Sequence, residues 1–129
     1  MDKQAVFGGS APVAGAPYSP GVKAGTLVFI SGQLGLDPQT GQPCATFEAQ
    51  VEGAIAGIRR LVESAGGTLD NVVKTTVFLA GDMSRFPALN AIYAQRFAGT
   101  VRPARSTFAV AALPLGALVE IEAIALVDG

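Results

Sequence analysis

Residues 46–65, TFEAQVEGAIAGIRRLVESA, decide the fold of this chain, because they carry its clearest helical pattern. Thr46 is a typical residue to cap a first turn, and Gly66-Gly67 is a typical stop. Between them, apolar side chains recur at steps of three and four and form one stripe: Phe47, Val51, Ala54, Ile55, Ile58, Leu61, Val62 and Ala65. A stripe of this kind must pack on another layer, and the flanking segments predict that this layer is a sheet.

The segments before this helix predict strands and turns. Residues 4–7 favour a short strand or arm, and residues 22–31 predict a hairpin that turns at residues 23–26, KAGT. Residues 36–41, LDPQTG, are typical of a loop that reverses the chain.

The segments after the helix predict a strand and a second helix. Residues 72–79, VVKTTVFL, have apolar residues on both faces of a strand, with Val73 and Val77 on one and Phe78 on the other. Ser84 is expected to cap the second helix. The buried stripe of that helix is predicted to be Phe86, Leu89, Ile92, Tyr93 and Phe97.

The end of the chain predicts two more strands. Residues 105–111 and 118–127 are expected to pair as a hairpin around residues 113–116, LPLG. One face of the final strand carries Val119, Ile121, Ala123 and Ala125, and the other carries Leu118, Glu120, Glu122, Ile124 and Leu126. The whole order predicts an α+β fold whose two helices cover one face of the sheet. Because several strands are apolar on both faces, we expect another subunit to cover the second face, with clefts at the subunit interfaces.

The composition excludes several classes of function. The chain has 129 residues, so we expect a single domain over residues 1–129. It has no histidine, which excludes a Ser-His-Asp triad and an HExxH zinc site. Its one cysteine, Cys44, excludes an internal disulfide. Nine basic and ten acidic residues, thinly spread, leave no footprint for nucleic acid.

The balance of apolar and charged residues predicts association. Hydrophobic residues make up 50% of the chain and charged residues 15%, against roughly 25% charged residues in typical soluble domains. A domain of this size buries only about two-thirds of its unfolded surface, so apolar surface is left over. No run approaches the roughly 18 apolar residues of a membrane span, and the first residues, MDKQ, lack a signal-peptide pattern. We therefore expect a cytoplasmic oligomer that does not bind membranes.

Two charged residues on predicted strands are candidates for chemistry. Arg105 lies at the start of a strand, where its guanidinium fork suits a ligand carboxylate. An internal salt bridge with Glu120 or Glu122, or a solvent-exposed strand end, is the alternative. Glu120 interrupts an aliphatic strand and is either a general acid or base or a residue of a wet sheet face. Burial would raise its pKa and a nearby arginine would lower it.

Three further positions have both a ligand-binding and a structural interpretation. Tyr18, in a proline-rich loop, can contact a small ligand or anchor the loop. Ser31-Gly32 ends a strand where glycine permits close backbone approach, or simply turns the chain. Asn90 shares a helix stripe with Tyr93, so its amide is expected to contact either a strand or a ligand.

Several motifs, in order over nearly the whole chain, resemble those of the Rid family, also called YjgF-like. They are APYS at 16–19, VFISGQ at 28–33, LDPQTG at 36–41, VKTTVFL at 73–79, RPARS at 102–106 and EIEAIA at 120–125. The resemblance implies a chorismate-mutase-like fold with a mixed sheet and two helices on one face. It also implies a homotrimer in which three sheets meet and the sites lie at subunit interfaces.

The same resemblance implies hydrolytic deamination of reactive 2-enamine and 2-imino acids, such as 2-aminoacrylate and 2-iminopropionate. The products are a 2-keto acid and ammonia, and no metal or cofactor is required. Arg105 would hold the substrate carboxylate, and Glu120 would position or activate water. The implied pocket residues are Tyr18, Ser31, Gly32, Asn90 and Thr107. Thr107 stands where the family often has cysteine, so its backbone N–H, not a thiol, would contact the ligand.

The sequence is also compatible with two other functions. A non-enzymatic module of the same fold could bind a small carboxylate or act as a chaperone through its apolar surface. Ribonuclease activity is disfavoured by the acidic balance, the missing histidine and the absence of a Lys/Arg stripe.

Overall fold

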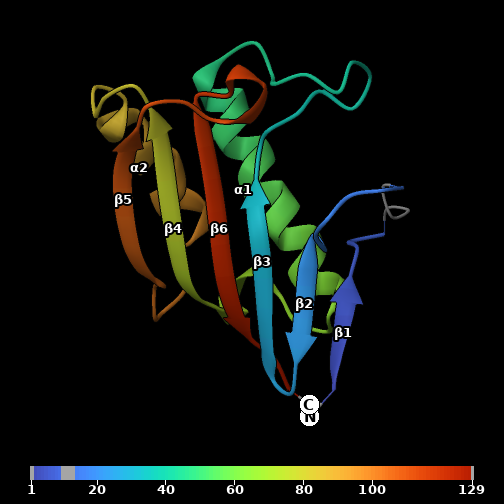
Figure 1. Ribbon diagram of the computed structural model, residues 1–129. Helices are drawn as coiled ribbons and strands as arrows, with labels where there is room; N and C mark the ends of the chain where they lie inside the picture. The colour runs from blue at the N-terminus through green and yellow to red at the C-terminus, as the bar shows by residue number, and fades with distance from the viewer. Residues whose placement is uncertain (1, 10–13, 129) are drawn as a thin grey trace.

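In the computed structural model, which describes residues 2–9 and 14–128, six strands form one mixed sheet in the order β1-β2-β3-β6-β4-β5 (Figure 1). Two helices lie behind this sheet and cover one of its faces (Figure 1). The strands are β1 (Lys3–Val6), β2 (Gly21–Ala24), β3 (Leu27–Gln33), β4 (Val72–Ala80), β5 (Ala104–Val110) and β6 (Val119–Leu126), and the helices are α1 (Phe47–Ser64) and α2 (Phe86–Arg96). The short 3-10 turns are η1 (Leu69–Asn71) and η2 (Pro114–Gly116).

Helix α1 forms where the sequence predicts it. The backbone N–H of Ala49 donates to Thr46 Oγ1 at 3.1 Å, so Thr46 is the predicted cap. The residues of α1 that are fully buried against the sheet are Val51, Ala54, Ile55, Ile58 and Val62. The predicted hairpin near the N-terminus is also confirmed, because β2 pairs antiparallel with β3.

The predicted hairpin of the last two strands is wrong. Strand β4 lies between β5 and β6, parallel to β5 and antiparallel to β6. Parallel neighbours need a crossover connection, and α2 supplies it between β4 and β5. The segment around η2 therefore carries the chain past β4 to β6 instead of forming a tight turn.

Two local details also differ from the sequence prediction. The pairing of β4 with β6 shifts register between Val72 and Lys74, which buries Val72 and leaves Val73 exposed, so Val73 does not share the buried face of Val77. Helix α2 begins after Arg85, and Ser84 does not cap it. The backbone N–H of Ser84 instead donates to Asp82 Oδ1 at 2.9 Å.

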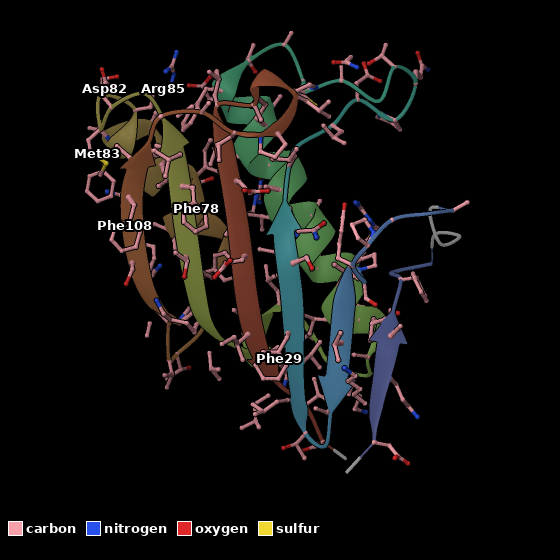
Figure 2. The ribbon with its side chains drawn as sticks, in the orientation of Figure 1. Phe29, Phe78, Asp82, Met83, Arg85 and Phe108 are labelled. Atoms are coloured by element: carbon pink, nitrogen blue, oxygen red, sulfur yellow. The ribbon has the colours of Figure 1, made fainter. Side chains whose placement is uncertain are left out.

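The sheet face away from the helices, called the open face below, carries exposed aromatic side chains. Phe29 on β3 and Phe108 on β5 are 44% and 54% exposed. The rings of Phe108 and Phe78 stack with centroids 6.5 Å apart, and all three rings lie on the side opposite the helices (Figure 2). The structure therefore confirms that the two helices leave one apolar face uncovered. None of the described helices is long and apolar enough to cross a bilayer.

Candidate active site

Arg105 lies on the edge strand β5 and faces helix α2. Its register partner on β4 is Thr75, a fully buried residue of the helix side of the sheet. Arg105 Nη1 donates to Asn90 Oδ1 at 2.8 Å, and the guanidinium carbon lies 4.8 Å from the ring centroid of Tyr93 and 5.4 Å from that of Phe86. These are cation–π distances, so α2 holds the guanidinium with two rings and one amide.

The three α2 residues around Arg105 share one helix face, because they are spaced four and three residues apart. Of the two interpretations of Asn90, the structure shows the helix-to-strand hydrogen bond. Phe86 and Tyr93 were predicted only as core residues. Their helical spacing with Asn90 was the one signal that could have placed them beside Arg105.

No carboxylate of the described residues pairs with Arg105. Among the described residues, the one salt bridge joins Arg96 and Glu52. The predicted alternative, an internal bridge from Arg105 to Glu120 or Glu122, is therefore not formed. A guanidinium has five N–H donors, and Asn90 accepts from one of them. The remaining donors suit an external carboxylate.

Thr107 lies two residues beyond Arg105, on the same side of β5, because its register partner is the fully buried Val77. Its Oγ1 is buried and has no hydrogen-bond partner among the described residues. An unpaired buried hydroxyl is costly, so a polar group brought to this position would find a ready partner.

Glu120 lies on the opposite side of the sheet. It alternates on β6 with the buried Val119 and Ile121 and pairs in register with Phe78, so it belongs to the open face. Partial burial raises the pKa of Glu120, and the like charge of Glu122 raises it further. A carboxylate with a raised pKa is a stronger base than an ordinary glutamate.

Arg105 and Glu120 of one chain therefore cannot hold the same small substrate. They lie on opposite faces of the sheet, and β4 separates their strands. Two strand spacings alone amount to about 10 Å.

The other predicted residues lie on the Glu120 side. Ser31 Oγ donates to the carbonyl oxygen of Ser19 at 2.7 Å, and the backbone N–H of Ser31 donates to the carbonyl oxygen of Pro20 at 2.9 Å. Ser31 thus ties the loop that carries Tyr18 to the end of β3. The side chain of Tyr18 is 67% exposed.

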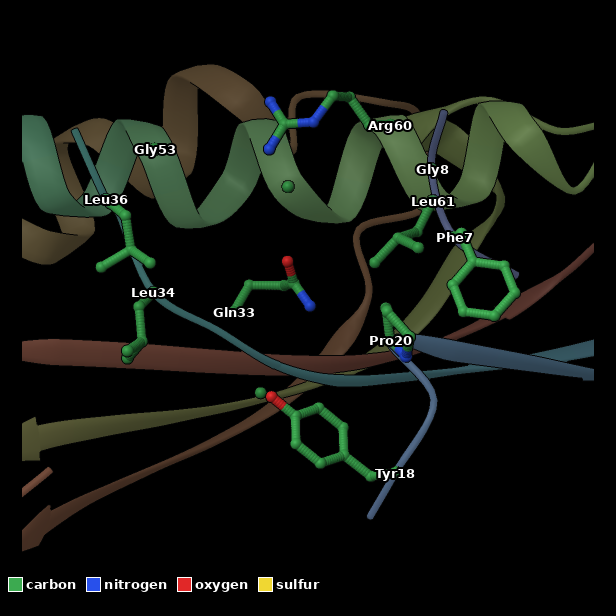
Figure 3. Close-up of a pocket in the computed structure, with 12 residues that line it drawn as sticks. Phe7, Gly8, Tyr18, Pro20, Gln33, Leu34, Leu36, Gly53, Arg60 and Leu61 are labelled. Atoms are coloured by element: carbon green, nitrogen blue, oxygen red, sulfur yellow. The ribbon is translucent and has the colours of Figure 1, made fainter. Parts of the chain in front are cut away.

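A cavity of about 440 Å³ lies between the end of β3, the N-terminal arm and α1 (Figure 3). Its lining includes Tyr18 and Gly32 but not Arg105. Gln33 lies within it, between Tyr18 and helix α1, and Gln33 Nε2 donates to the carbonyl oxygen of Ser31 at 2.9 Å (Figure 3). Gln33 ends the VFISGQ motif at residues 28–33, but the sequence pattern does not predict that it belongs to the site.

The predicted site residues thus form two groups. The arginine group, on the helix side at β5, is Arg105, Asn90 and Thr107. The glutamate group is Glu120 on β6, Ser31 and Gly32 at the end of β3, and Tyr18 in the loop that Ser31 holds there. Over residues 2–9 and 14–128, no three His, Cys, Asp or Glu side chains come close enough to hold a metal ion.

Comparison with protein families shows which family the chain belongs to. The model of the family described as endoribonuclease L-PSP matches residues 8–127. The chain belongs to the endoribonuclease L-PSP family. Relatives of this chain include RidA of a Psychrobacter species and the YjgF gene product of E. coli, so the resemblance to the Rid family is confirmed.

Individual relatives match over most of the chain. "Reactive Intermediate Deaminase A, chloroplastic" of Arabidopsis thaliana is 45% identical over 97% of this chain, which spans 66% of that relative's length. "2-iminobutanoate/2-iminopropanoate deaminase" of Mus musculus is 47% identical over 90% of this chain and 85% of its own. The crystal structure of the E. coli YjgF gene product, 38% identical, matches 95% of this chain and 98% of its own with a TM-score of 0.87. The L-PSP relatives therefore share the predicted α+β fold.

Proposed function

We propose that this protein hydrolyses reactive 2-enamine and 2-imino acids to 2-keto acids and ammonia. The observation that carries the proposal is Arg105, held by two rings and an amide with no anionic partner among the described residues. This arrangement suits a small substrate that carries a carboxylate. The deaminase names of relatives at 45–47% identity support the same reaction.

The proposed chemistry needs only Arg105, Glu120 and a water molecule. Arg105 binds the carboxylate of the protonated imine, whose C2 is already electrophilic. Glu120 takes a proton from a water molecule as its oxygen bonds to C2, and then returns that proton to the amino nitrogen of the carbinolamine. As the C–N bond breaks, ammonia leaves with the electron pair and Glu120 takes the proton of the carbinolamine hydroxyl, so that the 2-keto acid remains. That proton then passes to ammonia, which leaves as ammonium and restores the Glu120 carboxylate. The reaction gains mainly from positioning and proton transfer, and it uses no metal or cofactor.

We further propose that each site forms between two subunits of a homotrimer. The arginine group of one protomer would meet the glutamate group of its neighbour, since one protomer keeps them on opposite faces. Arg105 lies on the edge strand β5, which is where a neighbour can approach. The apolar open face gives the subunits a reason to associate, because its exposed rings would be buried by sister sheets.

The test is hydrolysis of 2-iminopropionate generated in situ, measured as keto-acid release above the spontaneous rate. Arg105→Lys keeps the charge but loses the bidentate fork, so we expect a large loss of kcat/KM. Arg96→Lys is the matched control, because Arg96 is exposed and forms its salt bridge with Glu52, away from Arg105. Wild-type rates in Arg105→Lys would overturn the proposal.

Two other functions give different results in this assay. A carboxylate-binding module would bind pyruvate through Arg105 but release no keto acid above background. A ribonuclease would cleave RNA in an Arg105-dependent way after stringent purification. A cytoplasmic location stays a prediction.

A further inference from the structure

Tyr93, the ring closest to Arg105, is held at both ends. It is 6% exposed, its hydroxyl lies 2.7 Å from Thr75 Oγ1, and its ring centroid lies 4.5 Å from that of Phe97. The hydrogen bond fixes the far end of the ring, and the contact with Phe97 limits its tilt. The ring under the guanidinium is therefore a fixed surface.

Thr75 is unusual for its place in the sheet. It is fully buried on a face of β4 whose next members are Val77 and Leu79. Burial of a hydroxyl costs free energy unless it is hydrogen-bonded, and valine would fill the same space without that cost. Core packing alone thus gives no reason for threonine here. Its hydroxyl bonds Tyr93, and its register partner is Arg105 itself.

We propose that Tyr93 is a positioning residue for Arg105, and that Thr75 sets the position of Tyr93. This inference rests on the proposed function, since it concerns how Arg105 presents itself to a substrate carboxylate. The Asn90 amide fixes the guanidinium at Nη1, and the Tyr93 ring fixes its plane. Two such restraints fix the orientation of the fork, and the N–H groups that Asn90 does not use are left for the carboxylate.

The expected effect falls on binding. The carboxylate is held equally in the bound substrate and in the transition state, so loss of Arg105 orientation raises KM more than it lowers kcat. Tyr93→Leu removes the ring, and we expect KM for 2-iminopropionate and Kd for pyruvate to rise roughly three- to thirty-fold.

The decisive variant keeps the core intact. Thr75→Val combined with Tyr93→Phe removes both hydroxyls at nearly constant shape, and such paired replacement is close to neutral for stability. Each single change leaves one buried hydroxyl unpaired and lowers Tm more than the pair does. We expect the pair to keep wild-type Tm yet raise the pyruvate Kd about two- to five-fold. If the double variant had wild-type Tm and wild-type pyruvate Kd, the hydrogen bond between Thr75 and Tyr93 would have a purely structural role, and the inference would be overturned.

Arg105→Lys, run in parallel, separates the two proposals. If it abolishes activity while the Thr75/Tyr93 pair keeps wild-type KM and Kd, the positioning inference fails and the proposed function stands. If Arg105→Lys keeps wild-type activity, both fail. Arg96→Gln, an exposed change on the same helix, is the control and should leave KM and Kd unchanged.

Discussion

The carboxyl carbon of Glu120 lies 2.6 Å from the point where a β-carbon on residue 32 would stand, so Gly32 and Glu120 fit only because residue 32 is glycine. Real β-carbons do not approach a heavy atom this closely. Any side chain at residue 32 therefore has to displace the Glu120 carboxylate from its present position.

Gly32→Ala should consequently separate folding from activity. The clash falls on the flexible end of Glu120 and not on backbone, so we expect Tm to change little. We expect kcat/KM for 2-iminopropionate to fall by up to roughly 100-fold, because a misplacement of about 1 Å can cost that much. Gly21→Ala is the matched control, since a β-carbon there meets only ordinary contacts of 3.4 Å or more. Full activity in Gly32→Ala would show that the position of Glu120 does not matter.

The pH dependence should respond to Glu122. In the proposed reaction Glu120 acts as a carboxylate, so activity is expected to fall as the pH drops through its pKa, and burial together with Glu122 raises that pKa. Glu122→Gln removes the like charge, lowers the pKa of Glu120 and moves the acid limb of the kcat/KM profile to lower pH. Glu63→Gln, on the exposed surface of α1, should leave the profile unchanged. An acid limb that moves upward in Glu122→Gln contradicts the assignment of Glu120 as base.

Mixed trimers can show whether a site draws on two subunits. Arg105→Ala and Glu120→Ala should each be inactive alone. The two variants are then unfolded together and refolded in equal amounts. If each site takes Arg105 from one subunit and Glu120 from the next, both groups are intact in about a quarter of the sites of the mixed trimers. The measurement is imine hydrolysis by the refolded mixture. Activity no higher than that of the separate variants would place both groups of one site in one subunit.

Assembly should depend on the open face. Phe29→Asp places a charge where the sister sheets are proposed to meet, and an unpaired buried charge is costly. We expect this variant to become monomeric in light scattering after gel filtration, and to lose activity with the trimer. Ala91→Asp, on the exposed side of α2, should stay trimeric. A trimeric Phe29→Asp protein would exclude the open face as the interface.

Local signals in the sequence predicted the elements well. Thr46 caps α1 as expected because a cap needs only its own backbone neighbours, and the apolar stripe of α1 follows from helical periodicity alone. Apolar residues on both faces of several predicted strands correctly indicated a sheet face that the helices leave uncovered.

Long-range relationships could not be predicted in the same way. No residue of β5 or β6 indicates which strand it pairs with, so the sequence pattern does not predict that β4 lies between them. That error also hid the face on which Arg105 lies, which follows from its pairing with Thr75. The hydrogen bond between Thr75 and Tyr93 joins residues of different elements, and nothing in either local pattern indicates it.

Thr107 gives the Arg105 side of the site a chemical character of its own. Peroxide converts an accessible thiolate first to sulfenic acid and then to irreversible oxides. A hydroxyl undergoes none of these steps, and the chain's one cysteine, Cys44, lies in the loop before α1. Residue 107 therefore gives peroxide no group to oxidise on the Arg105 side of the site, and the proposed deaminase activity should not be lost through oxidation there.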